Sequence, residues 1–382
     1  MFRPKRPNKL RPSLGAVTTE RFDTVIVGGG QAGLSIGYHL AKLGRRFVIL
    51  DAGERVGDPW RRRWDSLRVY TPARYSGLPG RRFPGPGFTY PGKDAVADYL
   101  ESYAADFELP VRTGVAVDAL SRNGDGYLLT AGGRRYEAES VVVASGAYHG
   151  LQVPAFAAEL DPGVLQLPST EYRNPSQLRE GGVLVVGAGN SGVEIALDVS
   201  GTHQTWISGR HPGSEPTRAG SVPDRLLMPL FWWLISHVVT LRTPIGRKVE
   251  PKAKAGTPLA RVRPKDLEAA GVERVPRTVG VQDGLPVLED GRVLDVANVI
   301  WCTGFRPDFR WIDLPVFGDD GEPVHDRGVV ESEPGLYFLG RPFLYGFTSS
   351  LIGGVGRDAE HIAKHIASKG SSVSASPRRS AA

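Results

Sequence analysis

Glycines recur twice in the spacing G-x-G-x-x-G, and each set directly follows a run of apolar, strand-forming residues. The first set is Gly28, Gly30 and Gly33, and the second is Gly187, Gly189 and Gly192, with Asn190 and Ser191 between its last two glycines. In a strand–turn–helix the first glycine allows the tight turn, the second lets backbone approach a pyrophosphate, and the third lets helix pack against strand. Free N–H groups at the start of the helix attract the anion. The spacing therefore predicts binding of two dinucleotides.

The segments around the two glycine sets also repeat, so we expect two copies of one fold to position them. Each set is followed by an amphipathic helical stretch and a short apolar strand, at 47–50 and at 205–207. Gly187 lies 159 positions after Gly28, and Gly304 lies 158 positions after Gly146, where a later strand ends in each copy. This agreement favours an internal duplication.

The later part of each copy has the turn pattern of a three-stranded meander that precedes a buried strand. The meanders are expected at 115–120, 127–130 and 134–137 and at 278–281, 286–288 and 292–294, and the buried strands at 140–144 and 299–301.

The expected fold class is α/β, with two Rossmann-type dinucleotide-binding domains, the second inserted into the first. The expected ranges are a basic disordered tail at 1–20, the first part of the first dinucleotide-binding domain at 21–150, the inserted second dinucleotide-binding domain at 151–304, a return to the first domain at 305–367, and a disordered tail at 368–382.

An acidic residue distinguishes the first copy. Asp51 follows the second strand, 21 residues after Gly30, where a carboxylate accepts hydrogen bonds from ribose hydroxyls. This pattern favours FAD as the ligand of the first copy.

The second copy has Ser208-Gly209-Arg210 at the corresponding place. A carboxylate would repel a 2′-phosphate, whereas Ser208 and Arg210 offer it a hydroxyl and a guanidinium. The pattern favours NADPH over NADH. The alternative is that Arg210 only pairs with a surface acid such as Glu215.

Two further segments are candidates for the site. Trp60 and Trp64 flank three arginines just after the Asp51 turn, and we expect the rings either to cover the flavin or to pack in the core, and the arginines to face phosphate or solvent. The segment 226–241 is strongly apolar but too short to span a bilayer. It is interpreted as a substrate-channel lid, a dimer contact, a peripheral membrane anchor or a buried helix.

Composition excludes several classes of function. Of the formal charge of +6, residues 1–20 contribute +4 and the last fifteen +3, which leaves about −1 for the body and gives no reason to expect nucleic-acid binding. The single cysteine, Cys302, excludes a redox dithiol pair within the chain. Histidine spacing predicts no metal site, and no G-x-S-x-G elbow occurs. No signal peptide and no 18-residue apolar stretch are recognised, so we expect a cytoplasmic protein.

Taken together, these motifs resemble the flavin-containing monooxygenase superfamily, and in particular its small bacterial FAD- and NAD(P)-dependent oxidoreductases. The resemblance covers about residues 22–366. It rests on the two glycine sets, the strand ends Ala144-Ser145-Gly146 and Cys302-Thr303-Gly304-Phe305, the segment Glu171–Pro175 and the stretch Gly335–Gly340.

The resemblance implies that NADPH reduces FAD and that the reduced flavin forms a C4a-(hydro)peroxide with O2, which gives one oxygen atom to a small organic substrate. It also implies that Gln31 and Trp60 lie near the flavin, that Val115 contacts the adenine side of FAD, and that Ser350 and Leu351 begin a helix facing the flavin ring. No catalytic residue is assigned.

One family motif is altered. In F-x-G-x-x-x-H-x-x-x-F/Y, Tyr172 fits the last position, but Pro168 stands at the histidine, and Val164 and Pro162 stand at the glycine and phenylalanine. The Tyr at the end argues against the Baeyer–Villiger class. The alternatives to a monooxygenase are an NADPH oxidase or other FAD-dependent oxidoreductase without oxygen transfer, and a non-catalytic FAD- and NADPH-binding regulator. A monomer or homodimer is expected.

Overall fold

The computed structural model describes residues 18–147, 150–214 and 219–373, and the side chains of 254–255 and 370–373 are not described. The predicted tails therefore lie mostly outside the described residues. Strand β1 begins at Thr19 and helix α8 extends to Val373, so the ends of both predicted tail ranges include residues in regular secondary structure.

The first sheet is built from both ends of the chain. Its order is β3-β2-β1-β6-β5-β4, and β16 also pairs with β6. Strands β2, β3 and β6 run parallel within it, whereas β4 and β5 form an antiparallel hairpin beside β6. The strands are β1 (Thr19–Val27), β2 (Phe47–Leu50), β3 (Val111–Arg112), β4 (Ala119–Asn123), β5 (Gly126–Ala131), β6 (Arg134–Val143) and β16 (Leu336–Phe338).

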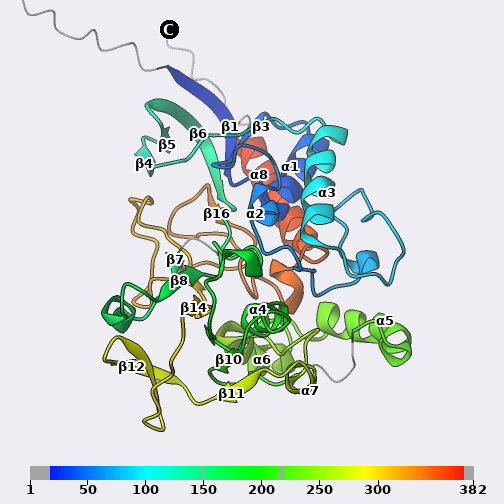
Figure 1. The fold of residues 1–382 in the computed structure, drawn as a ribbon. Coiled ribbons are helices and arrows are strands. Elements are labelled where there is room, and N and C mark those ends of the chain that lie inside the picture. The colour runs from blue at the N-terminus through cyan, green and yellow to red at the C-terminus, as the bar shows by residue number, and fades with distance from the viewer. Residues whose placement is uncertain (1–17, 148–149, 215–218, 374–382) are drawn as a thin grey trace, which may run out of the picture.

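Alternation of side chains gives this sheet two different faces. Ile26, Ile49 and Val142 point to one face, where helices α1 (Gln31–Lys42), α3 (Lys93–Asp106) and α8 (Val355–Val373) cover them. Val25, Val48 and Val141 point to the other face, which the β4–β5 hairpin and residues 309–317 cover. Figure 1 shows the three helices together on one side of the sheet and the hairpin on the other.

The second sheet is wholly parallel, with the order β11-β10-β9-β14-β8. Val183, Val185 and Ile300 face helices α4 and α7, and Leu184 and Trp301 face the opposite side. Its elements are β8 (Leu165–Pro168), β9 (Val183–Val186), α4 (Asn190–Val199), β10 (Thr205–Ser208), α7 (Pro264–Ala269), β11 (Glu273–Val275) and β14 (Asn298–Trp301). Two α/β units with separate cores confirm the expected fold class.

The chain leaves the first unit and returns to it at one place. Strands β7 (Gly150–Leu151) and β15 (Phe305–Arg306) pair antiparallel, with Phe305 opposite Leu151. After this pair the chain reaches β16 and rejoins the first sheet.

The remaining elements lie outside the two large sheets. They are α2 (Asp58–Arg61), α5 (Val222–His237), α6 (Pro244–Ala255), the hairpin β12 (Thr278–Gln282) and β13 (Leu285–Leu288), and the 3-10 turns η1 (Ala73–Tyr75), η2 (Ala155–Glu159), η3 (Pro175–Gln177) and η4 (Phe347–Ser350). Within the described ranges, no helix has the length and apolarity needed to cross a bilayer.

The meanders differ from the prediction. The segments predicted at 134–137 and 140–144 belong to one strand, β6, because β1 pairs with it from Arg135 to Val143 and so spans both segments. The strand predicted at 115–120 starts only at Ala119. In the second unit the third strand is reduced to a single bridge between Val287 and Val293, so only the β12–β13 hairpin forms.

Candidate functional site

The first glycine turn has no room for any other residue at two positions. Gly28 has φ +110°, and a Cβ built on it would lie 2.4 Å from the carbonyl oxygen of Ala144. A Cβ on Gly33 would lie 1.8 Å from the carbonyl oxygen of Gly28. Gly30 has no atom within 4 Å of its Cβ position. The turn is therefore tightly packed at Gly28 and Gly33 and open at Gly30, the glycine expected to approach a pyrophosphate.

The second glycine turn repeats this geometry. Gly187 has φ +113° and its Cβ would lie 2.2 Å from the carbonyl oxygen of Cys302. A Cβ on Gly192 would lie 1.7 Å from the carbonyl oxygen of Gly187, and Gly189 again faces open space. The duplication inferred from the sequence thus extends to individual steric contacts.

The helices that follow the two turns offer uncapped N-termini. The N-cap residues Gly30 and Gly189 have nearly equal backbone angles and supply no side-chain hydrogen bond to α1 or α4. The first N–H groups of a helix carry a partial positive charge and favour an anion when no side chain caps them. Both turns therefore fit the pyrophosphate of a dinucleotide.

Asp51 is held rigidly beside the first turn. Its carboxylate accepts hydrogen bonds from the backbone N–H of Gly29 at 2.5 Å and of Gly53 at 2.7 Å. Its carbonyl oxygen accepts the N–H of Val115 at 2.8 Å. The structure therefore brings Asp51 and Val115 together, and the fixed carboxylate retains lone pairs for ribose hydroxyls.

The corresponding position in the second unit is Gly209. Val27 pairs with Leu50 in the first sheet and Val186 pairs with Ser208 in the second, so the residues that follow, Asp51 and Gly209, are equivalent. Arg210 comes next and is exposed. The second unit therefore has an uncharged glycine where the first has the carboxylate of Asp51, and the next residue, Arg210, is a cation. The alternative partner Glu215 lies outside the described residues.

Ser208 does not have the role that the sequence suggested. Its side chain is buried, and its hydroxyl donates to the carbonyl of Pro276 at 2.9 Å and accepts the backbone N–H of Thr278 at 2.8 Å. The side-chain hydroxyl of Thr278 bonds to it as well. These contacts use the hydroxyl to hold the start of β12 beside β10, so Ser208 is not placed to bind a phosphate.

Asn190 begins α4 and also holds a neighbouring loop. Its amide donates to the hydroxyl of Thr257 and the carbonyl of Pro258, and its side-chain oxygen accepts the N–H of Ala260. Ser191 is half-buried beside it. The second glycine turn is thereby fixed to the segment that follows α6.

Gln31 and Ser350 lie in contact. The resemblance implied that both lie near the flavin, and therefore near each other. The side-chain amide of Gln31 donates to the carbonyl of Ser350 at 3.1 Å. The expected helix start was wrong, however: Ser350 ends the 3-10 turn η4, Leu351 follows it, and α8 begins only at Val355. Gly353 lies between the two elements, where a Cβ would meet the carbonyl of Tyr75 at 1.9 Å.

The aromatic loop after Asp51 joins the two units. Trp64 is 2% exposed and packs in the core of the second unit, while Trp60 packs half-buried against both cores. The backbone N–H of Asp65 donates to the carbonyl of Arg173 at 2.8 Å. Arg61 points to the carboxylates of Asp98 and Glu101 and not to a phosphate site.

Glu194 was missed in the sequence. It lies in the apolar stripe of α4, is 6% exposed, and pairs with Arg261 at 3.2 Å. Burial raises the pKa of Glu194 to about 7, and the attraction of Arg261 only partly opposes this. Arg261 also reaches the carbonyl of Arg68 in the first unit. The sequence signal that could have identified it is an acidic residue between the apolar residues Val193 and Ile195 of a helix expected to be buried.

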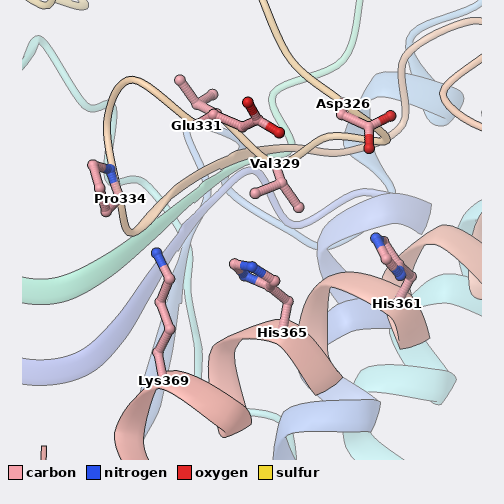
Figure 2. Close-up of a pocket in the computed structure, with 8 residues that line it drawn as sticks. Asp326, Val329, Glu331, Pro334, His361, His365 and Lys369 are labelled. Atoms are coloured by element: carbon pink, nitrogen blue, oxygen red, sulfur yellow. The ribbon is translucent and has the colours of Figure 1, made fainter. Parts of the chain in front are cut away.

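A separate pocket of about 330 Å³ lies within the first unit, between α8 and residues 326–334 (Figure 2). Figure 2 shows His361, His365 and Lys369 extending from α8 toward the segment that carries Asp326 and Glu331. None of the predicted dinucleotide residues lines it. The pocket is therefore distinct from the glycine turns.

A family model described as pyridine nucleotide-disulphide oxidoreductase matches residues 25–229, which include both glycine turns and the loop that joins the units. The chain belongs to this family. Within it, the single cysteine means that the chain carries no dithiol of its own.

Known relatives confirm the resemblance to flavin monooxygenases. A flavin-containing monooxygenase from Stenotrophomonas maltophilia is similar in structure, with a TM-score of 0.74 and 28% identity over 92% of this chain and 99% of that one. An uncharacterized CzcO-like oxidoreductase from Geobacillus kaustophilus is 39% identical, covering 90% and 98% of the two chains. A probable indole-3-pyruvate monooxygenase, YUCCA3 of Arabidopsis thaliana, is 29% identical over 94% and 89%. The chain is an oxidoreductase of the flavin monooxygenase type.

Proposed function

We propose that this oxidoreductase is an NADPH- and FAD-dependent monooxygenase that transfers one atom of O2 to a small organic substrate. The overall reaction consumes substrate, O2, NADPH and a proton and yields oxygenated substrate, NADP⁺ and water. The observation that carries the proposal is the pair of glycine turns with matching steric contacts, in which the residue after the second strand is Asp51 in the first unit and Gly209, followed by Arg210, in the second.

The residues of the first turn fit FAD. Asp51 would bind ribose hydroxyls, the open face at Gly30 and the start of α1 would bind the pyrophosphate, and Val115 would lie on the adenine side. Gln31 and Ser350, joined by their hydrogen bond, would border the flavin. Bound FAD supplies hydride acceptance and reaction with O2, chemistry that no protein side chain provides.

The residues of the second turn fit NADPH. Gly189 and the start of α4 would receive the pyrophosphate, and Arg210 would pair with the 2′-phosphate, which a carboxylate at position 209 would repel. The loop of Trp60 and Trp64, buried against both cores, would hold the two nucleotide sites together and exclude water between them.

Two features support oxygen transfer over the other reactions of the family. The chain lacks a second cysteine for dithiol chemistry. It covers nearly all of a flavin-containing monooxygenase at 28% identity. The plant relatives named as indole-3-pyruvate monooxygenases make α-keto acids a substrate class to test beside amines and sulfides.

The test supplies FAD-loaded protein with NADPH and isotopically labelled O2 in the presence of amines, sulfides and α-keto acids. We expect one substrate class to accelerate NADPH oxidation and to gain one labelled oxygen for each NADPH consumed. Release of one H2O2 per NADPH with every substrate would identify an oxidase instead. Binding of both dinucleotides without any NADPH oxidation would identify a non-catalytic regulator.

A further inference from the structure

Helix α5 presents an almost entirely apolar face to solvent. Val222, Leu226, Leu230 and Trp233 recur at helical spacing and are 69%, 75%, 58% and 53% exposed. Leu227 and Leu234, on the same side, are exposed as well. Single exposed leucines are normal, but a contiguous set on one helix marks an interaction surface. The interpretation of this segment as a buried helix was therefore wrong.

The opposite face of α5 holds it in this orientation. The carboxylate of Asp224, 2% exposed, accepts the hydroxyl of Tyr90 at 2.8 Å and the N–H of Gly220 at 2.9 Å. Trp232 stacks on Tyr75 with ring centroids 5.0 Å apart. The guanidinium of Arg357 donates to the carbonyl of Ser236. Because its polar groups are bonded inward, α5 cannot turn its leucines into the protein.

The helix pair α5–α6 is basic, unlike the rest of the protein body. Residues 222–255 carry six Lys or Arg and two acids, a net charge of +4. The rest of residues 21–367 carries a net of −5, because that whole range sums to −1. In α6, Ile245, Lys248 and Lys252 are exposed at helical spacing. Apolar and basic side chains are thus concentrated in one short stretch.

We propose that α5 and α6 dock on the surface of an anionic lipid bilayer, with the leucines and Trp233 at the acyl boundary and the lysines and arginines among the headgroups. Helices that lie in this interface combine a broad apolar face with basic residues, and tryptophan favours that depth. A second copy of the chain fits less well, because a twofold interface would place the same basic surface against itself. This inference does not depend on the proposed oxygen transfer.

The position of α5 gives the docking a consequence for the site. Its inner face contacts η4, the turn whose Ser350 bonds to Gln31. A bilayer against the outer face would therefore lie one helix away from the residues that border the first nucleotide site.

The test is flotation of the full-length protein with vesicles of phosphatidylcholine alone or mixed with phosphatidylglycerol. We expect binding to the anionic vesicles that weakens with salt, and at least a tenfold loss of binding in a Leu226→Ser, Leu230→Ser variant. Lys248→Glu with Lys252→Glu should remove the preference for anionic lipid. Val324→Ser, at an exposed valine outside α5, is the matched control and should bind as the wild type does.

Three results would overturn the proposal. Equal binding by the leucine variant would assign the interaction to other basic segments of the chain. Failure of the wild type to bind anionic vesicles would exclude a lipid partner. Concentration-dependent dimerisation that disappears in the leucine variant, without vesicle binding, would identify a second copy as the occupant. Circular dichroism and the melting temperature of each variant verify that it is folded.

Discussion

The side-chain amide of Gln31 lies 3.1 Å from the carbonyl oxygen of Ser350, although 319 residues separate the two along the chain. Gln31 is the first residue of α1 and Ser350 is the last residue of η4. The bond therefore joins the first glycine turn to the segment that returns from the second unit, and it assembles one site from both ends of the chain.

Replacing Gln31 by Ala should weaken FAD binding roughly 2- to 10-fold, because one hydrogen bond contributes about 0.5–1.5 kcal/mol. Titration of apoprotein with FAD measures the change. Gln166→Ala is the control, since Gln166 also donates to a carbonyl, that of Ala157, but in the second unit. An equal loss of FAD affinity in both variants would show that the effect is general destabilisation.

Gly189 and Gly192 should respond differently to alanine. In Gly192→Ala the added carbon lies 1.7 Å from the carbonyl of Gly187, so we expect a loss of stability of about 1–3 kcal/mol or more. In Gly189→Ala it meets open space, so stability should be kept while NADPH binding weakens at least about tenfold. Thermal unfolding and NADPH titration separate the two effects. Normal NADPH affinity in Gly189→Ala would show that no pyrophosphate binds there.

Arg210 should set the choice of nucleotide. Arg210→Ala should raise the KM for NADPH about tenfold or more and leave that for NADH nearly unchanged, because a charged hydrogen bond contributes about 1.5–3 kcal/mol. Ser208→Ala should lower stability by about 1–3 kcal/mol without altering the NADPH to NADH ratio, since its hydroxyl holds Pro276 and Thr278. A changed ratio in the Ser208 variant alone would reverse this assignment.

Glu194 should make stability fall as pH rises. Burial raises its pKa to about 7 in the folded protein, compared with an ordinary value of 4.5. Below pH about 4.5 the carboxyl is protonated in both states. Between that pH and about 7 only the unfolded chain loses the proton, so folding becomes less favourable, by up to about 3 kcal/mol above pH 7.

Glu194→Gln should remove this dependence and therefore gain stability relative to the wild type as pH increases from 5 to 8. Urea unfolding at several pH values measures the difference. Glu180→Gln, at an exposed position of the same unit, should show no such trend. A relative loss of stability in Glu194→Gln at pH 8 would mean that the ion pair with Arg261 outweighs the cost of burial.

The features that the sequence predicted well depend on short-range geometry. Each glycine turn requires its residues for contacts within the turn itself or with the adjoining strand, so the pattern, the duplication and Asp51 were readable from spacing. The altered motif also makes a short-range contact: Pro168 ends β8, and its carbonyl accepts the N–H of Tyr172, the last residue of the motif.

The features that were predicted poorly depend on partners distant in sequence. The hydroxyl of Ser208 is hydrogen-bonded to Pro276, and no sequence pattern near Ser208 indicates this contact. Trp64 follows the first glycine turn but packs in the core of the second unit. The continuity of β6 depends on β1, which lies far earlier in the chain and pairs with β6 from Arg135 to Val143. In these cases tertiary contacts, and not local sequence propensity, determine the structure.

The pairing of Phe305 with Leu151 places the entrance and the exit of the second unit on neighbouring strands. Residues 152–304 therefore form a cassette whose two ends could be joined by a turn of a few residues, leaving the first sheet with all of its strands. A single recombination event could therefore exchange the second unit as a whole, provided that the core of the incoming unit accommodates Trp64 of the first unit. The same junction is where an engineer would graft a nucleotide module from a relative.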